Sequence, residues 1–259
     1  MDQFHPSMPR PLARAMRLWP RSGLRSGMEQ IYAGLPATKC ARKGACCGLL
    51  PPMQPVEMLA WLSELSREEL ETSSAEAVEL VRHFLSNAAR RLPCPWARKT
   101  SCARYERRFF GCRAYGLWSA KAFEPRRRQS LQAAGRVQLA WRNLGITLPP
   151  EVCAAPPVYC DKVEQVSGPA IEDAGLDALE SGLAGLGAEK AWYGLLAPCG
   201  GDLSYLVAGL ALGWQECLRA KVAMTRALLA GDAERAEDLL AQAEEEARAW
   251  ARWIAKHPA

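Results

Sequence analysis

The chain has 259 residues, enough for one large domain or two small ones, and its apolar share of 49% and charged share of 24% are normal for a soluble globular protein. Ten cysteines, about 4% of the chain, are too few for a disulfide scaffold. The longest apolar run, near residues 203–214, falls short of the about 20 residues that cross a bilayer, so no membrane span is expected.

The first thirty residues form a basic segment without the uninterrupted apolar core of a secretory signal. Its arginines are Arg10, Arg14, Arg17, Arg21 and Arg25. An Arg-rich, acid-poor transit peptide stays open as an alternative. We interpret the segment as a partly ordered arm on a cytoplasmic protein, where reduced cysteines serve as metal ligands or catalytic groups.

A cysteine-rich loop over 38–53 follows this arm, and a short helix begins at Pro55. Ser73 and Glu76 match the spacing of a capping box, which predicts that the next helix starts there and continues to about residue 92. Residues 93–125 break the helical periodicity and carry three more cysteines among aromatic residues. A helix over 127–143 and a proline-rich turn with two cysteines come next.

The last ninety residues predict helices near 172–184, 188–197, 203–229 and 233–256. Gly231 and Asp232 form the turn before the last of them, so the chain ends in a helical hairpin. The expected fold is therefore mainly α, with a loop-rich, metal-binding cysteine core packed with helices. The expected divisions are a basic arm over 1–37, a cysteine domain over 38–165 and a C-terminal helical region over 166–259.

Charge is distributed unevenly along the chain. Residues 90–142 hold fourteen Lys and Arg against two Glu, whereas residues 151–190 hold eight acids against two lysines. The run from Arg126 to Arg128 would begin a helix, where the dipole disfavours cations, and this suggests an acidic protein or redox partner. Aromatic residues among the arginines would also suit nucleic acid, which we rank last because they equally suit a hydrophobic shell.

Eight cysteines lie in loops flanked by Lys, Arg, Gly and Pro, a setting that favours metal ligation over burial in a core. They are Cys40, Cys46, Cys47, Cys94, Cys102, Cys112, Cys153 and Cys160. Cys199 and Cys217 fall in predicted helices, and we expect them to be structural. The three histidines suggest no catalytic pair with serine or cysteine, and His83 on an amphipathic helix is expected to be structural.

The order of these cysteines resembles the YkgJ-type cysteine-cluster family, a zinc- or iron-chelating domain with the pattern CxxCxxCC followed by three spaced cysteine blocks. The match covers about residues 38–160. Lys43 stands where the family has its second cysteine, and Phe109 replaces a proline. The matching positions are Cys40, Cys46, Cys47, Cys94 with Trp96, Cys102 with Tyr105 and Arg108, and Cys112 with Arg113 and Tyr115, with Cys153 or Cys160 as the late cysteine.

The resemblance implies a metal or iron–sulfur site, and the distantly related flagellin lysine-N-methylases imply cluster chemistry as well. Without a C-x2-C pair, and with Cys46 and Cys47 adjacent, the residues favour a [4Fe–4S] cluster over zinc, which remains the alternative. Arg108, Arg113, Tyr105 and Tyr115 would surround the anionic centre. The chain is expected to be a redox or metal-handling protein. A cluster-dependent enzyme such as a protein lysine methylase is the other alternative, although no nucleotide-binding loop is evident.

Overall fold

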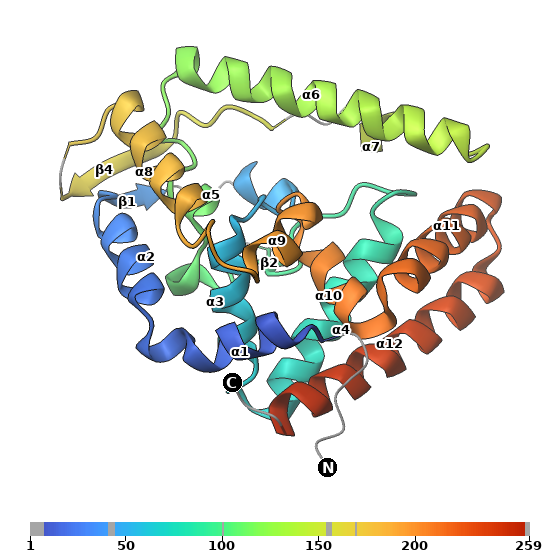
Figure 1. The fold of residues 1–259 in the computed structure, drawn as a ribbon. Coiled ribbons are helices and arrows are strands. Elements are labelled where there is room, and N and C mark those ends of the chain that lie inside the picture. The colour runs from blue at the N-terminus through green and yellow to red at the C-terminus, as the bar shows by residue number, and fades with distance from the viewer. Residues whose placement is uncertain (1–7, 41–44, 100, 154–156, 169, 257–259) are drawn as a thin grey trace. The chain divides into compact units, whose positions relative to one another are not determined.

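A computed structural model describes residues 8–40, 45–99, 101–153, 157–168 and 170–256, apart from the side chains of Cys40, Ala45 and Cys46. The described chain is mainly helical, which confirms the predicted fold class (Figure 1). It divides into two compact units that alternate along the sequence. Unit 1 comprises 1–26, 52–89 and 186–259, and unit 2 comprises 27–51 and 90–185. The three contiguous divisions expected from the sequence stay a prediction.

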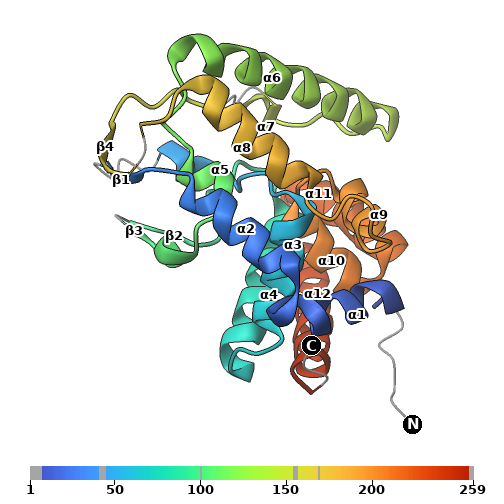
Figure 2. The same ribbon diagram turned by 60° about the vertical axis from the view of Figure 1, so that its left-hand side comes forward.

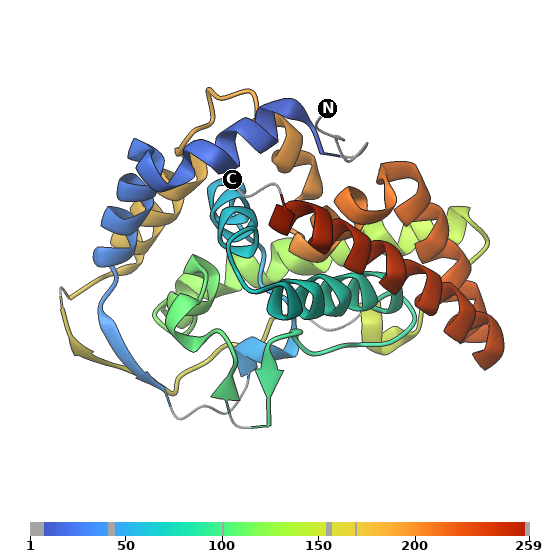
Figure 3. The ribbon, with the colours of Figure 1, turned by 90° about the horizontal axis from the view of Figure 1, so that it is seen from below.

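Unit 1 is a bundle in which α4 contacts α10, α11 and α12, while α1 and α9 pack on α3. Figure 3 shows α4 and α12 running side by side. The α11–α12 pair, joined through Gly231, is the predicted C-terminal hairpin. The helices are α1 (Arg10–Leu18), α3 (Pro55–Leu65), α4 (Leu70–Ser86), α9 (Tyr193–Leu196), α10 (Leu203–Leu212), α11 (Trp214–Ala230) and α12 (Ala233–Lys256), with the 3-10 helices η1 (Trp19–Arg21) and η4 (Ala197–Cys199).

The predicted helix over 203–229 is two helices, because Gly213 adopts a φ of 86° that ends α10 and redirects the chain into α11. The turn folds Trp214 back onto α10. A Cβ placed on Gly209 would lie 2.3 Å from the Trp214 ring, so only glycine leaves room for this contact. The apolar run alone did not reveal the break.

Two other helix predictions in unit 1 were wrong. α4 begins at Leu70, before the proposed cap, and the Ser73 hydroxyl donates to the Leu70 carbonyl at 3.1 Å instead of capping the helix. Of the helix predicted over 188–197, only Tyr193–Leu196 is α-helical, since Gly187 has a φ of 80° and the residues after it form turns.

Unit 2 combines one long helix, α6, with short elements and long connections. Its strands form two antiparallel pairs, β1 with β4 and β2 with β3. The end of α2, whose range is Gly23–Ala33, packs on α8, and Figure 2 shows the two helices side by side. The other elements are β1 (Ala37–Cys40), η2 (Ala45–Gly48), β2 (Ala97–Arg98), β3 (Ser101–Cys102), η3 (Tyr105–Arg107), α5 (Phe110–Arg113), α6 (Ala120–Asn143), α7 (Pro150–Cys153), β4 (Val163–Ser167) and α8 (Asp173–Gly185).

The longest helix of unit 2, α6, begins seven residues earlier than predicted. The Ser119 hydroxyl caps it by accepting from the Ala122 amide at 3.2 Å, and the helix passes through Pro125. Pro125 is the sixth residue of α6 and has no amide to donate to the carbonyl of residue 121, so the helix continues although one intrahelical hydrogen bond is missing. Only Phe123 and Trp141 of α6 are buried, so its middle turns face solvent.

Candidate metal centre

All eight cysteines predicted to bind metal belong to unit 2, whereas the two predicted to be structural, Cys199 and Cys217, belong to unit 1. The side chains of Cys40 and Cys46 lie outside the described residues. Of the other six, Cys94 is buried, and Cys47, Cys102, Cys112, Cys153 and Cys160 are half-buried. The fold thus separates the two groups of cysteines that the local sequence distinguishes.

The first two cysteine segments meet through the backbone. The Cys94 amide donates to the Cys47 carbonyl at 2.9 Å, and the Cys94 carbonyl accepts from Ala97 at 2.9 Å. Ala97 pairs with Cys102 across β2 and β3. Residues from three separate cysteine positions are therefore held by one set of loop hydrogen bonds.

Aromatic packing brings in the segment that contains Cys112. The Phe109 ring lies 5.6 Å from the Trp96 ring, centroid to centroid, and the Phe109 carbonyl accepts from the Cys112 amide at 3.0 Å. Trp96 follows Cys94 by two residues, so this contact joins the Cys94 and Cys112 segments.

Of the two late cysteines, Cys160 has its backbone close to Gly116, four residues after Cys112. Gly116, with a φ of 85°, lets the chain after Cys160 approach closely: a Cβ at Gly116 would lie 2.5 Å from Val163 and 3.4 Å from the Cys160 carbonyl. The Tyr115 hydroxyl donates to the Val158 carbonyl. Val163 also pairs with Cys40 in the β1–β4 ladder, so Cys40 and Cys160 are carried by adjoining segments.

Cys153 has a different location. It ends α7, which packs on α6, and the charge of Arg142 in the last turn of α6 acts on its thiol. Burial raises the pKa of Cys153, and this effect outweighs the opposing influence of Arg142. Tyr115 and Gly116 precede the other end of α6, and a 24-residue helix is about 36 Å long. The structure therefore does not bring Cys153 to the other cysteines.

Within the described part of the chain, no three His, Cys, Asp or Glu side chains lie in positions that would hold a metal ion. Cys40 and Cys46 do not enter that search, because their side chains are not described. The loop contacts join backbone segments that carry cysteines, so donors from these segments would be thiols. Thiols suit a thiophilic centre, either zinc or iron–sulfur.

Tyr105, Arg108 and Arg113, which were predicted to surround the metal, mainly make contacts within the loop between Cys102 and Cys112. Arg108 donates to the Tyr105 carbonyl at 3.0 Å and lies 3.9 Å from the centroid of its ring. Arg113 donates to the carbonyls of Arg108 and Glu106 at 2.7 and 2.8 Å. These contacts shape the loop from which two of the thiols project.

Sequence analysis missed Arg104. It is only 8% exposed and its guanidinium lies 5.4 Å from the Trp96 ring centroid, so a buried cation packs on a ring that follows Cys94 by two residues. In the sequence, the feature that could have indicated Arg104 is its position two residues after Cys102 and next to Tyr105.

The run Arg126–Arg128 lies two turns inside α6, so the argument from an unfavourable helix start was wrong. Arg126 pairs with Asp177 at 2.6 Å and with Glu180 at 2.8 Å, and it stacks on Trp118. Arg127 and Arg128 pair with Glu124 within α6. Much of this charge is therefore neutralised inside unit 2.

Unit 1 contains His83, Cys199 and Cys217 but shows no catalytic pair among them. Both ring nitrogens of His83 are buried without a hydrogen-bond partner among the described residues, and burial lowers its pKa. Burial raises the pKa of Cys199 to about 12 and that of Cys217 to about 11. Thiols in this state are poor nucleophiles and poor metal ligands.

No known protein family, curated protein or solved structure matches the chain. Among the described residues, no single helix has the length and apolar character to cross a membrane. The segments Tyr193–Cys199 and Leu203–Leu212 reach that composition only together, and they are bent by 113°.

Proposed function

We propose that unit 2 is a cysteine-ligated metal domain that binds a [4Fe–4S] cluster and serves in redox or metal handling in a reducing compartment such as the cytoplasm. The observation that carries the proposal is the sorting of the cysteines. The eight cysteines that the sequence predicted to lie in loops all belong to unit 2, whereas Cys199 and Cys217 are buried in unit 1, where burial raises the pKa of both thiols.

The ligands would come from seven cysteines, with Cys160 rather than Cys153 as the late member. The backbone contacts between the segments of Cys47, Cys94, Cys102 and Cys112 support this choice, as does the close approach of Cys160 to Gly116. When bound, the cluster supplies one-electron chemistry. The chain's own contribution is to hold the thiols, limit water around Cys94 and place the buried charge of Arg104 nearby.

The basic part of unit 2 supports an acidic protein or redox partner as the binding partner. Arg107 and Arg136 are exposed, and the segment 90–142 keeps its strong excess of Lys and Arg. A partner bound through such charges would dissociate as salt is raised, because exposed charges are screened within about 10 Å at 0.1 M salt.

Anaerobic purification followed by absorption and EPR spectra, with iron, sulfide and zinc analysis, tests the proposal. A brown protein with about four iron and four sulfide per chain, bleached by dithionite, is the expected result. A colourless protein with stoichiometric zinc would replace the cluster by the zinc alternative. Protein containing neither metal would overturn the proposal.

Matched cysteine substitutions test the choice of ligands. Cys112→Ser and Cys160→Ser are expected to lose most of the bound metal. Cys153→Ser and Cys217→Ser should keep it, because Cys153 lies near the far end of α6 and Cys217 lies in unit 1. Metal content per folded chain is the measurement, and equal loss in the variants of Cys153 and Cys160 would contradict the assignment.

A further inference from the structure

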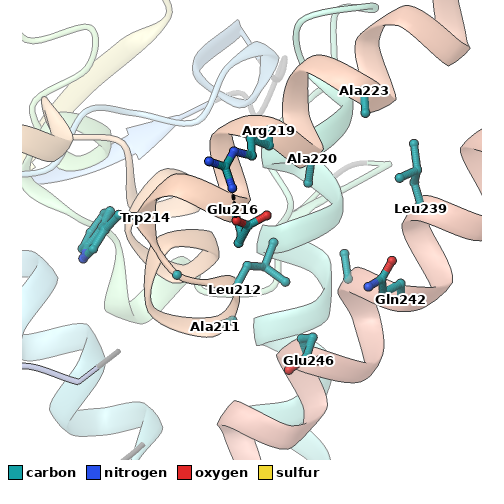
Figure 4. Close-up of a pocket in the computed structure, with 12 residues that line it drawn as sticks. Ala211, Leu212, Trp214, Glu216, Arg219, Ala220, Ala223, Leu239, Gln242 and Glu246 are labelled. Atoms are coloured by element: carbon teal, nitrogen blue, oxygen red, sulfur yellow. Dashed lines mark hydrogen bonds and ion pairs between the residues drawn. The ribbon is translucent and has the colours of Figure 1, made fainter. Parts of the chain in front are cut away.

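A groove of about 700 Å³ lies in unit 1, where the turn between α10 and α11 meets one face of α11 and α12. Its surface is formed largely by small or apolar residues, with polar groups along the edges. Figure 4 shows Leu212 on one side and Gln242 of α12 on the other, and the ion pair of Glu216 with Arg219. The small and apolar residues of the lining include Ala211, Leu212, Ala220, Ala223, Leu239 and Ala243.

The alanines make the groove suitable for a helix. Side chains at a helix contact set the distance between the two axes, and alanine permits a close approach. The lining positions on α12 are 239, 242, 243 and 246, which lie on one face of that helix. An amphipathic helix that lays its apolar side chains into such a groove is a common mode of recognition.

The charge of the groove differs between its two helices. On α11 the lining residue Glu216 is paired with Arg219, whereas on α12 the lining residue Glu246 carries negative charge. The first part of α12, residues 233–246, contains six Asp and Glu and a single Arg. The occupant expected from this charge is a basic amphipathic helix.

The chain itself contains such a helix. α6 carries six Lys and Arg against one Glu. Arg128, Leu131, Gly135, Leu139 and Arg142 recur at intervals of three and four residues, so they share one face. Leu131 is 37% and Leu139 is 59% exposed, and a Cβ at Gly135 would meet nothing within 4 Å.

We propose that copies of this chain associate by placing the Arg128–Arg142 face of α6 from one copy into the α11–α12 groove of another. Leu131 and Leu139 enter between the alanines, and the open surface at Gly135 allows the two backbones to approach. Arg142 meets Glu246 on α12, and Arg128 meets the other acids in the first part of α12 by exchanging its exposed ion pair with Glu124. The contact joins two different surfaces, so two variants that are each defective on one surface can complement one another.

Analytical ultracentrifugation of the full, metal-loaded chain across the micromolar range tests association. Leu131→Asp with Leu139→Asp on α6, and Ala220→Trp with Glu246→Arg in the groove, are each expected to weaken self-association at least about tenfold, since anchors at a contact centre dominate binding. Val137→Asp and Leu218→Asp are the matched controls. Val137 and Leu218 are both exposed. Val137 lies off the proposed face of α6, and Leu218 is not among the groove-lining residues.

Mixing the two defective variants gives the decisive measurement. Each retains one intact surface, so the mixture is expected to form a complex of two copies, one of each variant, that neither variant forms alone. A wild-type chain that stays monomeric, controls that lose association equally, or a mixture that gives no complex would each overturn the proposal. Circular dichroism and metal content of every variant show whether the fold is retained.

Discussion

The two units differ in what holds them together. Of the twelve largest fully buried side chains among the described residues, ten belong to unit 1 and only Leu176 and Leu183 to unit 2. Unit 1 packs long helices around Trp61 and Trp250. Unit 2 has short strands and loops fixed by backbone hydrogen bonds, by ion pairs such as Arg126 with Asp177, and by arginines stacked on aromatic rings.

A bound metal, as proposed for unit 2, would add to the stability of that unit. Burial of apolar area is the main favourable term in folding, and a loop-rich region with few buried leucines has little of it. A metal that joins several loops adds stability directly, because its binding free energy becomes folding free energy. Unit 1 needs no such cross-link.

Metal removal is expected to have the largest effect and to act on unit 2 alone. Anaerobic chelation should remove most amide protection from β1, β4 and α5, while α4, α10 and α12 keep theirs. Hydrogen exchange of the loaded and chelated protein measures this difference. Equal protection of unit 2 in both states would show that the metal does not support its fold.

Loss of a central side chain in unit 1 should come next. Trp250 is fully buried on α12, and Trp250→Ala should lower the free energy of unfolding of unit 1 by about 3–5 kcal/mol. Leu218→Ala on α11, where the leucine is 47% exposed, should change it by about 0.5 kcal/mol or less. Denaturant unfolding followed by helical circular dichroism distinguishes the two, and equal effects would contradict the assigned core.

Lys221 gives unit 1 a dependence on pH. Its ammonium donates to the Asn87 side chain at 2.7 Å and lies 4.0 Å from the Phe84 ring centroid. Burial lowers its pKa to about 8, although the charges of Asp202 and Cys217 act to raise it.

The proton therefore binds less tightly in the folded state than in the unfolded chain, whose lysine pKa is 10.5. The cost of burying the charge is fully present below pH 8 and disappears as the pH rises toward 10.5. Lys221→Met should stabilise unit 1 by about 1–3 kcal/mol at pH 7 and by less at pH 10. Thermal unfolding at both pH values tests this, with Lys256→Met at an exposed position as the control. A gain independent of pH would contradict the explanation.

The smallest effect is expected from the ion pair between α6 and α8. Asp177 is 59% exposed, so Asp177→Asn should cost unit 2 less than about 1 kcal/mol, and raised salt should reduce the difference. Hydrogen exchange in α8 is the measurement. A large loss would mean that polar contacts contribute more to unit 2 than the comparison of the two units suggests.

Periodicity predicted the long helices where one apolar face persists. The helix over 233–256 has the predicted bounds, and α8 differs from its prediction by one residue at each end. Periodicity failed where a single glycine redirects an otherwise continuous apolar run, as at Gly213, and at the start of α6, which the Ser119 cap places seven residues before the predicted start. Backbone conformation and capping decide these positions, and apolar periodicity does not report them.

For the candidate site, sequence reasoning distinguished the loop cysteines from Cys199 and Cys217, but it could not decide between Cys153 and Cys160. That choice depends on the length of α6 and on the close approach at Gly116, both of which are tertiary. Arg104 was missed because its burial comes from the folding of the loop around Trp96. No local feature of the sequence predicts that the two units alternate along the chain.

The alternation of the units has a consequence for biosynthesis. Every loop cysteine precedes residue 161, whereas unit 1 needs the segment 186–259 to complete its bundle. A chain that emerges from the ribosome N-terminus first exposes all the thiols before α10, α11 and α12 exist. If unit 2 binds the proposed metal, that interval during translation would allow iron or zinc to reach the thiols before the bundle closes.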